Sequence, residues 1–483
     1  MRGTRFMSRA MPSLVRLAPW VTFRGAGLLL AVAVLATGCR VKAPPKPVEI
    51  QKDGMPHIAV PAAWTGASGT ASPATENWVL TFNNNELNVL VAEALAYNPD
   101  LAVAASRVEQ ARLYARQAGA ALWPSVQGMA RGGGTMSDGS GLTGGAISAT
   151  WELDLWGRVR YGKAAASAGA SSTEADFRYA QQALAATVVK SWILAVEARL
   201  QLAVAKELLT TSEQLVQLAE TRVRVGVGDD MDASIARSDA GAYRDVVRRL
   251  ELARNQADRA IEIVVGRYPS GTIETGSDFP AFPGDLPAGL PSELLERRPD
   301  VIAAERRVAA AFNRVGEAKA ARLPRIALTV GVNSVSSDLF ILADRDNPVW
   351  SAGANLLMPL FTGGALKRQV EIRKEEQKEA VAHYASIGLR AFGDVEEAMA
   401  SELAMRDRER ILTAQLVDSQ HAVDLARTRY QIGSGDLRAV EQRQIALSAN
   451  RSALLRVQAE QRIQRVNLHL ALGGGFVLPP VTP

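Results

Sequence analysis

Few side chains in this chain of 483 residues could do chemistry, and they are scattered along it. The sequence has no HExxH pattern and no cluster of cysteines and histidines, so the ligand spacings of zinc sites are missing. It also has no Gly-rich loop followed by Lys-Ser or Lys-Thr, and no nucleophile elbow. We therefore predict neither an enzyme nor a protein with a metal or bound cofactor; the four histidines stand apart at His57, His383, His421 and His469.

The one residue with a predictable modification is Cys39, the single cysteine. It follows a short apolar run from Gly25 to Gly38, which arginines precede, and this layout is typical of a secretory signal peptide. Leu35-Ala36-Thr37-Gly38-Cys39 resembles the bacterial lipobox, with Ala36 where Leu is usual, and a lipobox cysteine carries a covalent lipid. We predict a signal peptide over 1–38 and a lipid on Cys39; the alternative is a buried free thiol in an uncleaved chain.

Composition excludes several other classes of protein. The hydrophobic fraction of 47% and the charged fraction of 22% are those of a folded chain, not of a disordered or collagenous one. The net charge of +5 overstates the basicity of the mature protein, because five arginines precede the apolar run. No basic block with interleaved aromatic residues is present, so we expect no nucleic-acid partner.

The chain consists of two copies of one long unit. Asn98-Pro99-Asp100 corresponds to Arg298-Pro299-Asp300, and ten of 27 aligned positions are identical at this offset of 200. The correspondence resumes at an offset of 205 with Leu155-Trp156 and Leu360-Phe361, and ends at an offset of 207 at the glycines described below. A period near 200 indicates a duplicated domain rather than a solenoid. We predict a lipidated tether over 39–77, a first repeat over 78–270, a linker over 271–290, a second repeat over 291–475 and a tail over 476–483.

Most of each repeat is predicted to be helical. Six prolines among Gly, Ser and Thr favour an extended conformation for the tether, and the helical pattern begins at Trp78. One stretch of 55 residues lacks Gly and Pro entirely, which predicts a rod of roughly 80 Å. The expected helices are an initial one over 100–121, long ones over 171–225 and 365–432, and returning ones over 232–266 and 436–472.

Four segments alternate between apolar and polar residues, as strands with one apolar face do. From Ile147 to Leu155 the odd positions are apolar and the even ones polar, and Trp350 to Leu360 repeats the pattern. Ile326 to Asn333 is predicted to pair with the second, and Ser125 to Gly134 with the first, although Met129 there lies on the polar face. An ordinary half-buried sheet in a soluble protein is the alternative explanation.

Four strands are too few to close a barrel, whereas three chains with four strands each would give twelve. Closure would remove the strand edges that lipid cannot satisfy. Trp151 and Trp350 would then face outward. The predicted lumen residues, which share the polar parity, are Arg131, Ser148, Thr150, Glu152, Asp154, Arg325 and Asn355.

Together these features resemble the outer membrane factor family, the TolC-like and OprM-like exit ducts, in its lipoprotein (NodT-type) branch. The residues that carry the resemblance are 61–64 (PAAW), 98–101 (NPDL), 298–301 (RPDV), 153–158 (LDLWGR), 359–364 (PLFTGG) and 472–475 (LGGG), where Phe476 replaces the usual Trp. The resemblance implies a mainly α, α+β fold: a trimeric 12-stranded transmembrane β-barrel continuous with a long periplasmic α-helical barrel, built from a duplicated chain.

The resemblance also implies roles for the two turns between long and returning helices. Glycines there, Gly226, Gly228, Gly433 and Gly435, would let adaptor hairpins approach and dock. Charged residues near the turns would close the periplasmic end, with the alternative that they merely cap helices. We predict that replacing Arg429 or Tyr430 raises channel conductance in intact trimers; the full candidate gate is Asp229, Asp230, Asp232, Arg429, Tyr430, Asp436 and Arg438.

The family resemblance implies a passive exit duct for drugs or other small molecules. Its expected partners are two further copies of the chain, outer-membrane lipid, a periplasmic adaptor protein and an inner-membrane transporter of the RND type. Type I protein secretion and metal efflux are alternatives within the family. A lipid-anchored periplasmic coiled-coil scaffold without a pore is the alternative from another class, and the alternating strands argue against it.

Overall fold

The computed structural model describes residues 41–65, 77–131, 143–282, 291, 294–336 and 349–474. The predicted signal peptide, Cys39, the tail over 476–483 and most of the loops between paired strands lie outside these residues. The chain divides into two compact units. Unit 1 comprises Met1–Pro44, Ala118–Lys163 and Asn313–Ile372, and unit 2 comprises Pro45–Gln117, Ala164–Phe312 and Arg373–Pro483. Each unit takes residues from both repeats, so the compact units differ from the domains predicted from the sequence.

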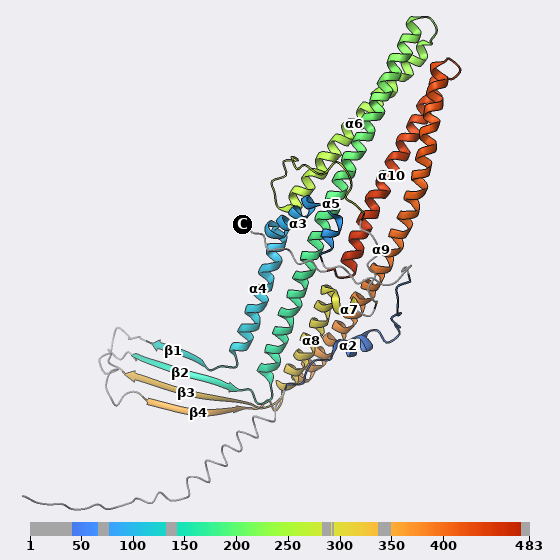
Figure 1. Ribbon diagram of the computed structural model, residues 1–483. Helices are drawn as coiled ribbons and strands as arrows, with labels where there is room; N and C mark the ends of the chain where they lie inside the picture. The colour runs from blue at the N-terminus through green and yellow to red at the C-terminus, as the bar shows by residue number, and fades with distance from the viewer. Residues whose placement is uncertain are drawn as a thin grey trace, which may run out of the picture. The chain divides into compact units, whose positions relative to one another are not determined.

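Unit 1 is built on one antiparallel sheet of four strands in the order β1-β2-β3-β4 (Figure 1). The central pair, β2 and β3, joins the first repeat to the second through eleven residue pairs. β1 and β4 therefore form the two edges of the described sheet. The strands are β1 (Ser125–Arg131), β2 (Thr143–Leu153), β3 (Arg325–Ser336) and β4 (Val349–Leu357).

The register of this sheet places the alternating apolar positions of the four strands on the same face. Trp151 lies opposite Leu328, and Val332 lies opposite Trp350. Because directly opposed residues share a face, the two tryptophans lie on the same face, as predicted. This apolar face continues across all four strands through Val126, Ile147, Ala149, Leu153, Ile326, Val330, Ala352, Ala354 and Leu356.

The helices come in two similar sets, one per repeat. α5 (Arg158–Arg224) and α9 (Ala365–Gln431) each hold 67 residues, which at 1.5 Å per residue is about 100 Å. Proline at the first helical position starts α4 (Pro99–Ala120) and α8 (Pro299–Ala320), each of 22 residues. The remaining helices are α2 (Pro47–Gly54), η1 (Trp78–Phe82), α3 (Asn85–Tyr97), α6 (Asp230–Val265), α7 (Leu294–Arg297) and α10 (Leu437–Ala471).

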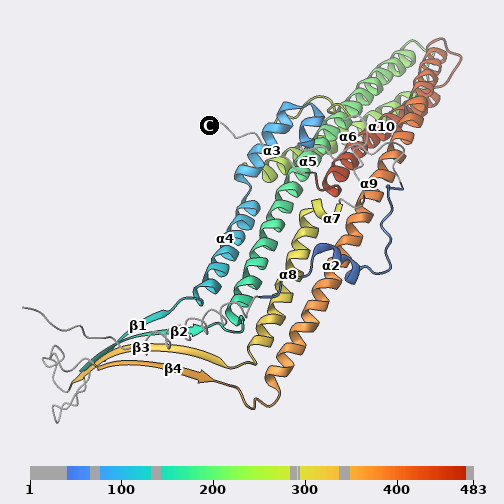
Figure 2. The ribbon, with the colours of Figure 1, turned by 60° about the horizontal axis from the view of Figure 1, so that its bottom comes forward.

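In unit 2 the long helices pack as two hairpins, α5 with α6 and α9 with α10 (Figure 2). The widest apolar cluster surrounds Trp192 and Ile261 and includes Trp78 and Phe82 from η1. Towards the turns a smaller cluster joins both hairpins through Leu215, Ala236, Tyr430, Leu437 and Val440.

The structure corrects the predicted start of the first long helix. α5 begins at Arg158 and not at Ser171. The prediction stopped at the glycines before Ser171, but Asp154 caps the helix start, and a single Gly in a long helix costs only about 1 kcal/mol. β2 accordingly ends at Leu153, two residues before the predicted Leu155.

The structure also corrects the predicted extended tether. Pro47–Gly54 is a helix, with the Glu49 carboxylate accepting a hydrogen bond from the Lys46 backbone N–H at 3.0 Å. Ile50 and Trp64 are buried in a cluster with Tyr384 of α9. This segment is ordered by its burial within unit 2, which proline content alone does not reveal.

Within the described ranges, no helix combines the length with the apolarity that crossing a bilayer requires.

Candidate channel lining and helix-hairpin turns

The polar face of the sheet brings most of the predicted lumen residues together. Thr150 lies opposite Thr329, and Ser148 lies opposite Gly331. Ala327 has Glu152 on one side and Asn355 on the other, which places these two residues on the same face. By alternation Arg131 and Arg325 hold positions on that face too. Over most of the strand length the face therefore carries hydroxyl, amide and glycine positions, among them Ser125, Gln127, Asn333, Ser351 and Gly353.

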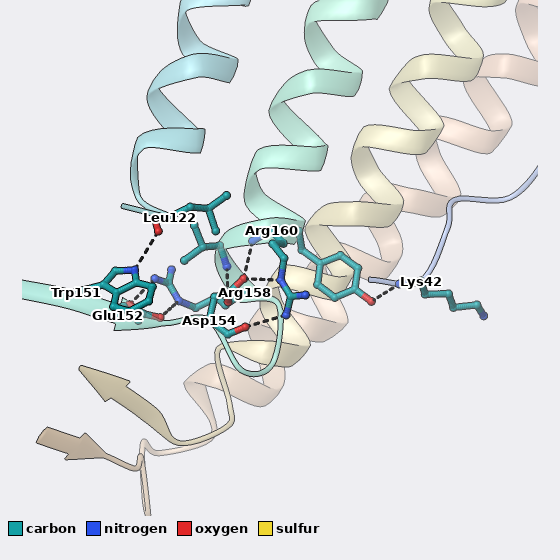
Figure 3. Close-up of polar contacts among 9 residues, drawn as sticks. Lys42, Leu122, Trp151, Glu152, Asp154, Arg158 and Arg160 are labelled. Atoms are coloured by element: carbon teal, nitrogen blue, oxygen red, sulfur yellow. Dashed lines mark hydrogen bonds and ion pairs between the residues drawn. The ribbon is translucent and has the colours of Figure 1, made fainter. Parts of the chain in front are cut away.

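The two predicted lumen carboxylates are engaged where β2 gives way to α5 (Figure 3). Glu152 forms a bidentate ion pair with Arg158, with N–O distances of 3.0 and 2.8 Å. Asp154 lies beyond the end of β2, and its carboxylate accepts the backbone N–H groups of Val159 and Arg160 at 3.0 and 2.9 Å. Asp154 also pairs with the Arg160 guanidinium at 3.1 Å. Asp154 thus caps a helix and does not continue the polar face of the strand, contrary to the prediction.

Tryptophan side chains mark the same junction. The Trp151 indole donates to the Leu122 carbonyl at 2.9 Å, and the Trp156 indole donates to the Pro324 carbonyl at 2.7 Å. Both rings keep part of their surface exposed, and Trp123 is 75% exposed. Indoles with satisfied N–H groups and exposed rings are typical of the boundary between lipid and water.

The first hairpin turn ends α5 with a left-handed glycine. Gly226 has a φ of +77°, and its N–H donates to the Val223 carbonyl at 3.0 Å. The Val227 N–H donates to the Arg222 carbonyl at 3.0 Å, which completes a Schellman motif. A Cβ on Gly228 would lie 2.7 Å from the Arg222 Cβ, so only glycine fits there.

The second turn repeats this geometry at the offset of 207. Gly433 also has a φ of +77° and donates to the Tyr430 carbonyl at 3.1 Å, while the Ser434 N–H donates to the Arg429 carbonyl at 2.9 Å. A Cβ on Gly435 would lie 3.1 Å from the Arg429 Cβ. The duplication therefore extends to individual hydrogen bonds.

Two of the candidate gate acids cap helices. The Asp229 carboxylate accepts the Met231 N–H at 2.9 Å, and the Asp436 carboxylate accepts the Ala439 N–H at 2.6 Å. This is the capping role given above as the alternative to a gate. The remaining charged candidates lie in or beside the turns with exposed or half-exposed side chains: Asp230, Asp232, Arg429 and Arg438.

Tyr430 joins the two hairpins of one chain. Its side chain is only 2% exposed, and the guanidinium carbon of Arg222 lies 5.0 Å from its ring centroid. Arg222 also donates to the Tyr430 carbonyl at 3.3 Å. Burial raises the pKa of Tyr430. Tyr430 is one of the gate candidates predicted from the sequence and Arg222 is not, although the offset of 207 aligns Arg222 with the candidate Arg429.

A carboxyl pair that is not among the predicted site residues lies in α6 and α10, close to the turns. Glu441 of α10 is 8% exposed. Burial, the neighbouring Asp239 of α6 and then Asp232 raise the pKa of Glu441 to about 7, while Arg438 opposes the shift. Glu441 and Asp239 come from different repeats, so no local pattern could have predicted their contact.

No group of three or more His, Cys, Asp and Glu side chains is placed to hold a metal ion among the residues that the structure describes.

Comparison with known proteins agrees with this architecture. The chain is 28% identical over 463 residues to the cation efflux system protein CusC of Escherichia coli (strain K12), covering 93% of this chain and 99% of CusC. It is 31% identical over 442 residues to the pyoverdine export outer membrane protein OpmQ of Pseudomonas putida, covering 87% of this chain and 93% of OpmQ. The solved structure of the outer-membrane channel OprN matches with a TM-score of 0.78 at 26% identity, covering 87% of this chain and 98% of OprN.

A family model described as outer membrane efflux protein matches residues 90–267 and 290–474, which are well over half of the chain. The chain therefore belongs to the outer membrane efflux protein family.

Proposed function

We propose that this outer-membrane efflux protein is the passive exit duct of a tripartite system, in which three copies of the chain form one channel. The observation that carries the proposal is the four-stranded sheet with one apolar face and one polar face. In lipid every backbone N–H and C=O must be paired, which only helices and closed barrels achieve. β1 and β4 are the edges of the described sheet, so pairing β1 of one copy with β4 of the next would close twelve strands.

The polar face of the sheet would then line the water-filled passage. Its positions within the strands are mostly uncharged, and Glu152 is neutralised by Arg158 at the helix junction. Such a wall favours passage of small molecules of either charge, because no fixed charge opposes them along most of the strands. Relatives differ in the cargo that their names state, cation efflux for CusC and pyoverdine export for OpmQ. We infer that the inner-membrane pump selects the cargo. We expect this pump to be a proton-driven RND transporter.

The hairpin turns are the proposed docking surface for the adaptor. Their glycine-dependent geometry leaves the backbone open, and the apolar side chains around it are exposed in one chain: Val225, Val227, Met231 and Ile432. Exposed apolar groups that cluster on a soluble surface mark sites of protein association.

A lipid on Cys39 is the proposed second membrane attachment. Val41, two residues further on, contacts Gly157 in the strand-to-helix junction of unit 1, where the tryptophans lie. A chain held there would bring Cys39 to the level at which the sheet leaves the bilayer, as an acyl anchor requires.

The test is the behaviour of purified protein in mild detergent and in planar lipid bilayers. We expect a trimer that gives discrete single-channel currents carried by both the cations and the anions of the salt solution. The same protein should restore export of a drug-like dye to cells that lack their own duct. A monomer without conductance would overturn the proposal in favour of a pore-less scaffold. Restored protein secretion without dye export would instead favour the type I alternative.

A further inference from the structure

We propose that Gly157, Tyr161 and Gly316 form a seat that holds the chain immediately after the lipid-bearing cysteine, so that the anchor is fixed against the channel wall. The proposal rests on the proposed lipidation of Cys39. We call these three residues the N-terminal seat. All three lie in unit 1, as do the residues that they hold, Val41 and Lys42.

The contacts of the seat are specific. The Lys42 backbone N–H donates to the Tyr161 hydroxyl at 3.0 Å, across 119 residues of sequence. Gly157 has a φ of +76°, and a Cβ placed on it would lie 3.4 Å from a methyl carbon of Val41. The Tyr161 ring packs on the backbone of α8, where a Cβ on Gly316 would lie 2.5 Å from the ring. Any side chain at Gly316 would therefore displace the ring and its hydroxyl.

The seat breaks the duplication. The surrounding junction is repeated, since Leu155-Trp156 corresponds to Leu360-Phe361 at the offset of 205. At the starts of α5 and α9 the offset is 207, so Gly157 corresponds to Gly364, which also has a positive φ, and Tyr161 corresponds to Arg368. At the offset of 200 Gly316 corresponds to Arg116. The corresponding positions thus keep one left-handed glycine but have neither the tyrosine hydroxyl nor the glycine on which its ring packs. A feature present in only one of two copies serves something that occurs once per chain, and the chain has one lipid-bearing end.

The seat also limits where the lipid can enter. Two residues of extended chain span at most about 7 Å, so holding Val41 keeps the Cys39 backbone within that distance. Trp156, a residue that is 44% exposed, lies in the same junction and donates its indole N–H to the Pro324 carbonyl. The acyl chains would therefore enter the lipid beside the tryptophans at the end of the sheet where β2 meets α5. A loose tether would leave the anchor free to enter anywhere within its reach.

Trypsin cleavage after Lys42 tests the seat in the full-length, membrane-extracted protein. The next basic residue, Lys46, precedes Pro47 and is a poor trypsin site, so a product that begins at Ala43 reports release of the seated segment. In Tyr161→Phe the ring stays but the acceptor is lost. We expect this product to form about 2- to 10-fold faster, the change that corresponds to one hydrogen bond. Gly316→Ala should give at least the same acceleration, and Tyr97→Phe, at an exposed tyrosine elsewhere, should give none.

Oligomeric state and acylation are measured on the same samples, so that misfolding and missing lipid are recognised. Equal cleavage rates in folded, acylated wild type and Tyr161→Phe would overturn the seat and leave the proposed lipidation standing. Tyr161-dependent protection in a protein whose Cys39 carries no lipid would support the seat and overturn the lipid anchor. Equal protection of wild type and Cys39→Ser would support a seat formed by the chain itself.

Discussion

Arg222 connects the two hairpins near their turns. Its guanidinium lies over the Tyr430 ring and bonds the Tyr430 carbonyl. Arg222→Gln removes the cation–π contact, worth about 0.5–2 kcal/mol. If separation of the hairpins opens the channel, the open population should rise by about 2- to 30-fold, measured as single-channel activity of intact trimers. Arg224→Gln is the matched control, because among the residues that the structure describes Arg224 bonds Thr221 of its own helix alone. Unchanged activity in Arg222→Gln would place the constriction elsewhere.

His469 makes stability depend on pH. It stacks on Trp78 with ring centroids 5.4 Å apart, and burial, followed by the nearby Arg465, lowers its pKa to about 3. An unfolded histidine has a pKa near 6.5, so below that pH the unfolded state binds a proton that the folded state refuses.

We therefore expect His469 to contribute a fall of about 1.4 kcal/mol per pH unit to the free energy of unfolding as the pH drops from about 6.5 towards 3, seen as the difference from a variant without this histidine. Thermal unfolding followed across this window measures the slope. His469→Phe retains an aromatic ring against Trp78 and should lack this contribution to the slope. Identical slopes in the two proteins would contradict the assignment to His469.

At the scale of elements, the turns offer a test in which the duplication supplies the control. Gly228→Ala places a Cβ 2.7 Å from the Arg222 backbone and side chain, whereas Gly435→Ala meets the Arg429 Cβ at 3.1 Å. We expect Gly228→Ala to destabilise its hairpin by about 1–3 kcal/mol and to weaken adaptor binding more than Gly435→Ala does. Calorimetry and adaptor pull-down measure the two effects. Equal effects at both positions would show that the turns do not depend on this contact.

The elements themselves were predictable where one periodicity governs them. Two-residue alternation located the four strands, because a sheet with one apolar face imposes that pattern. The glycines of both turns were found for a similar reason, since a left-handed helix end selects glycine. The start of α5 was missed because the cap at Asp154 outweighs the glycines that follow.

What the sequence did not reveal depends on contacts between distant segments. α2 is short and is stabilised by packing against α9 through Ile50. The Asp239–Glu441 contact joins two repeats, and the Arg222–Tyr430 contact does the same. The duplication points to Arg222 as a candidate, because Arg222 aligns with Arg429. The alignment does not indicate which residue Arg222 contacts.

For the whole molecule, the proposed channel has two independent attachments to the outer membrane, the sheet and the lipid. Cys39→Ser, exported through a cleavable signal peptide, loses only the second. We expect it to remain in the outer-membrane fraction after a high-salt and carbonate wash, because the barrel spans the bilayer by itself. Release of this variant as a soluble periplasmic protein would favour the pore-less, lipid-anchored scaffold.

The central claim is that the two faces of the sheet meet lipid and water respectively. Ser148 and Ala149 are neighbours on β2 and lie on opposite faces. Cys39 is the single natural cysteine, so Ser148→Cys and Ala149→Cys in a Cys39→Ser background each carry one thiol. Assembled trimers treated with a membrane-impermeant, water-soluble maleimide should be labelled at position 148 and protected at position 149. Equal labelling at the two positions would contradict the account.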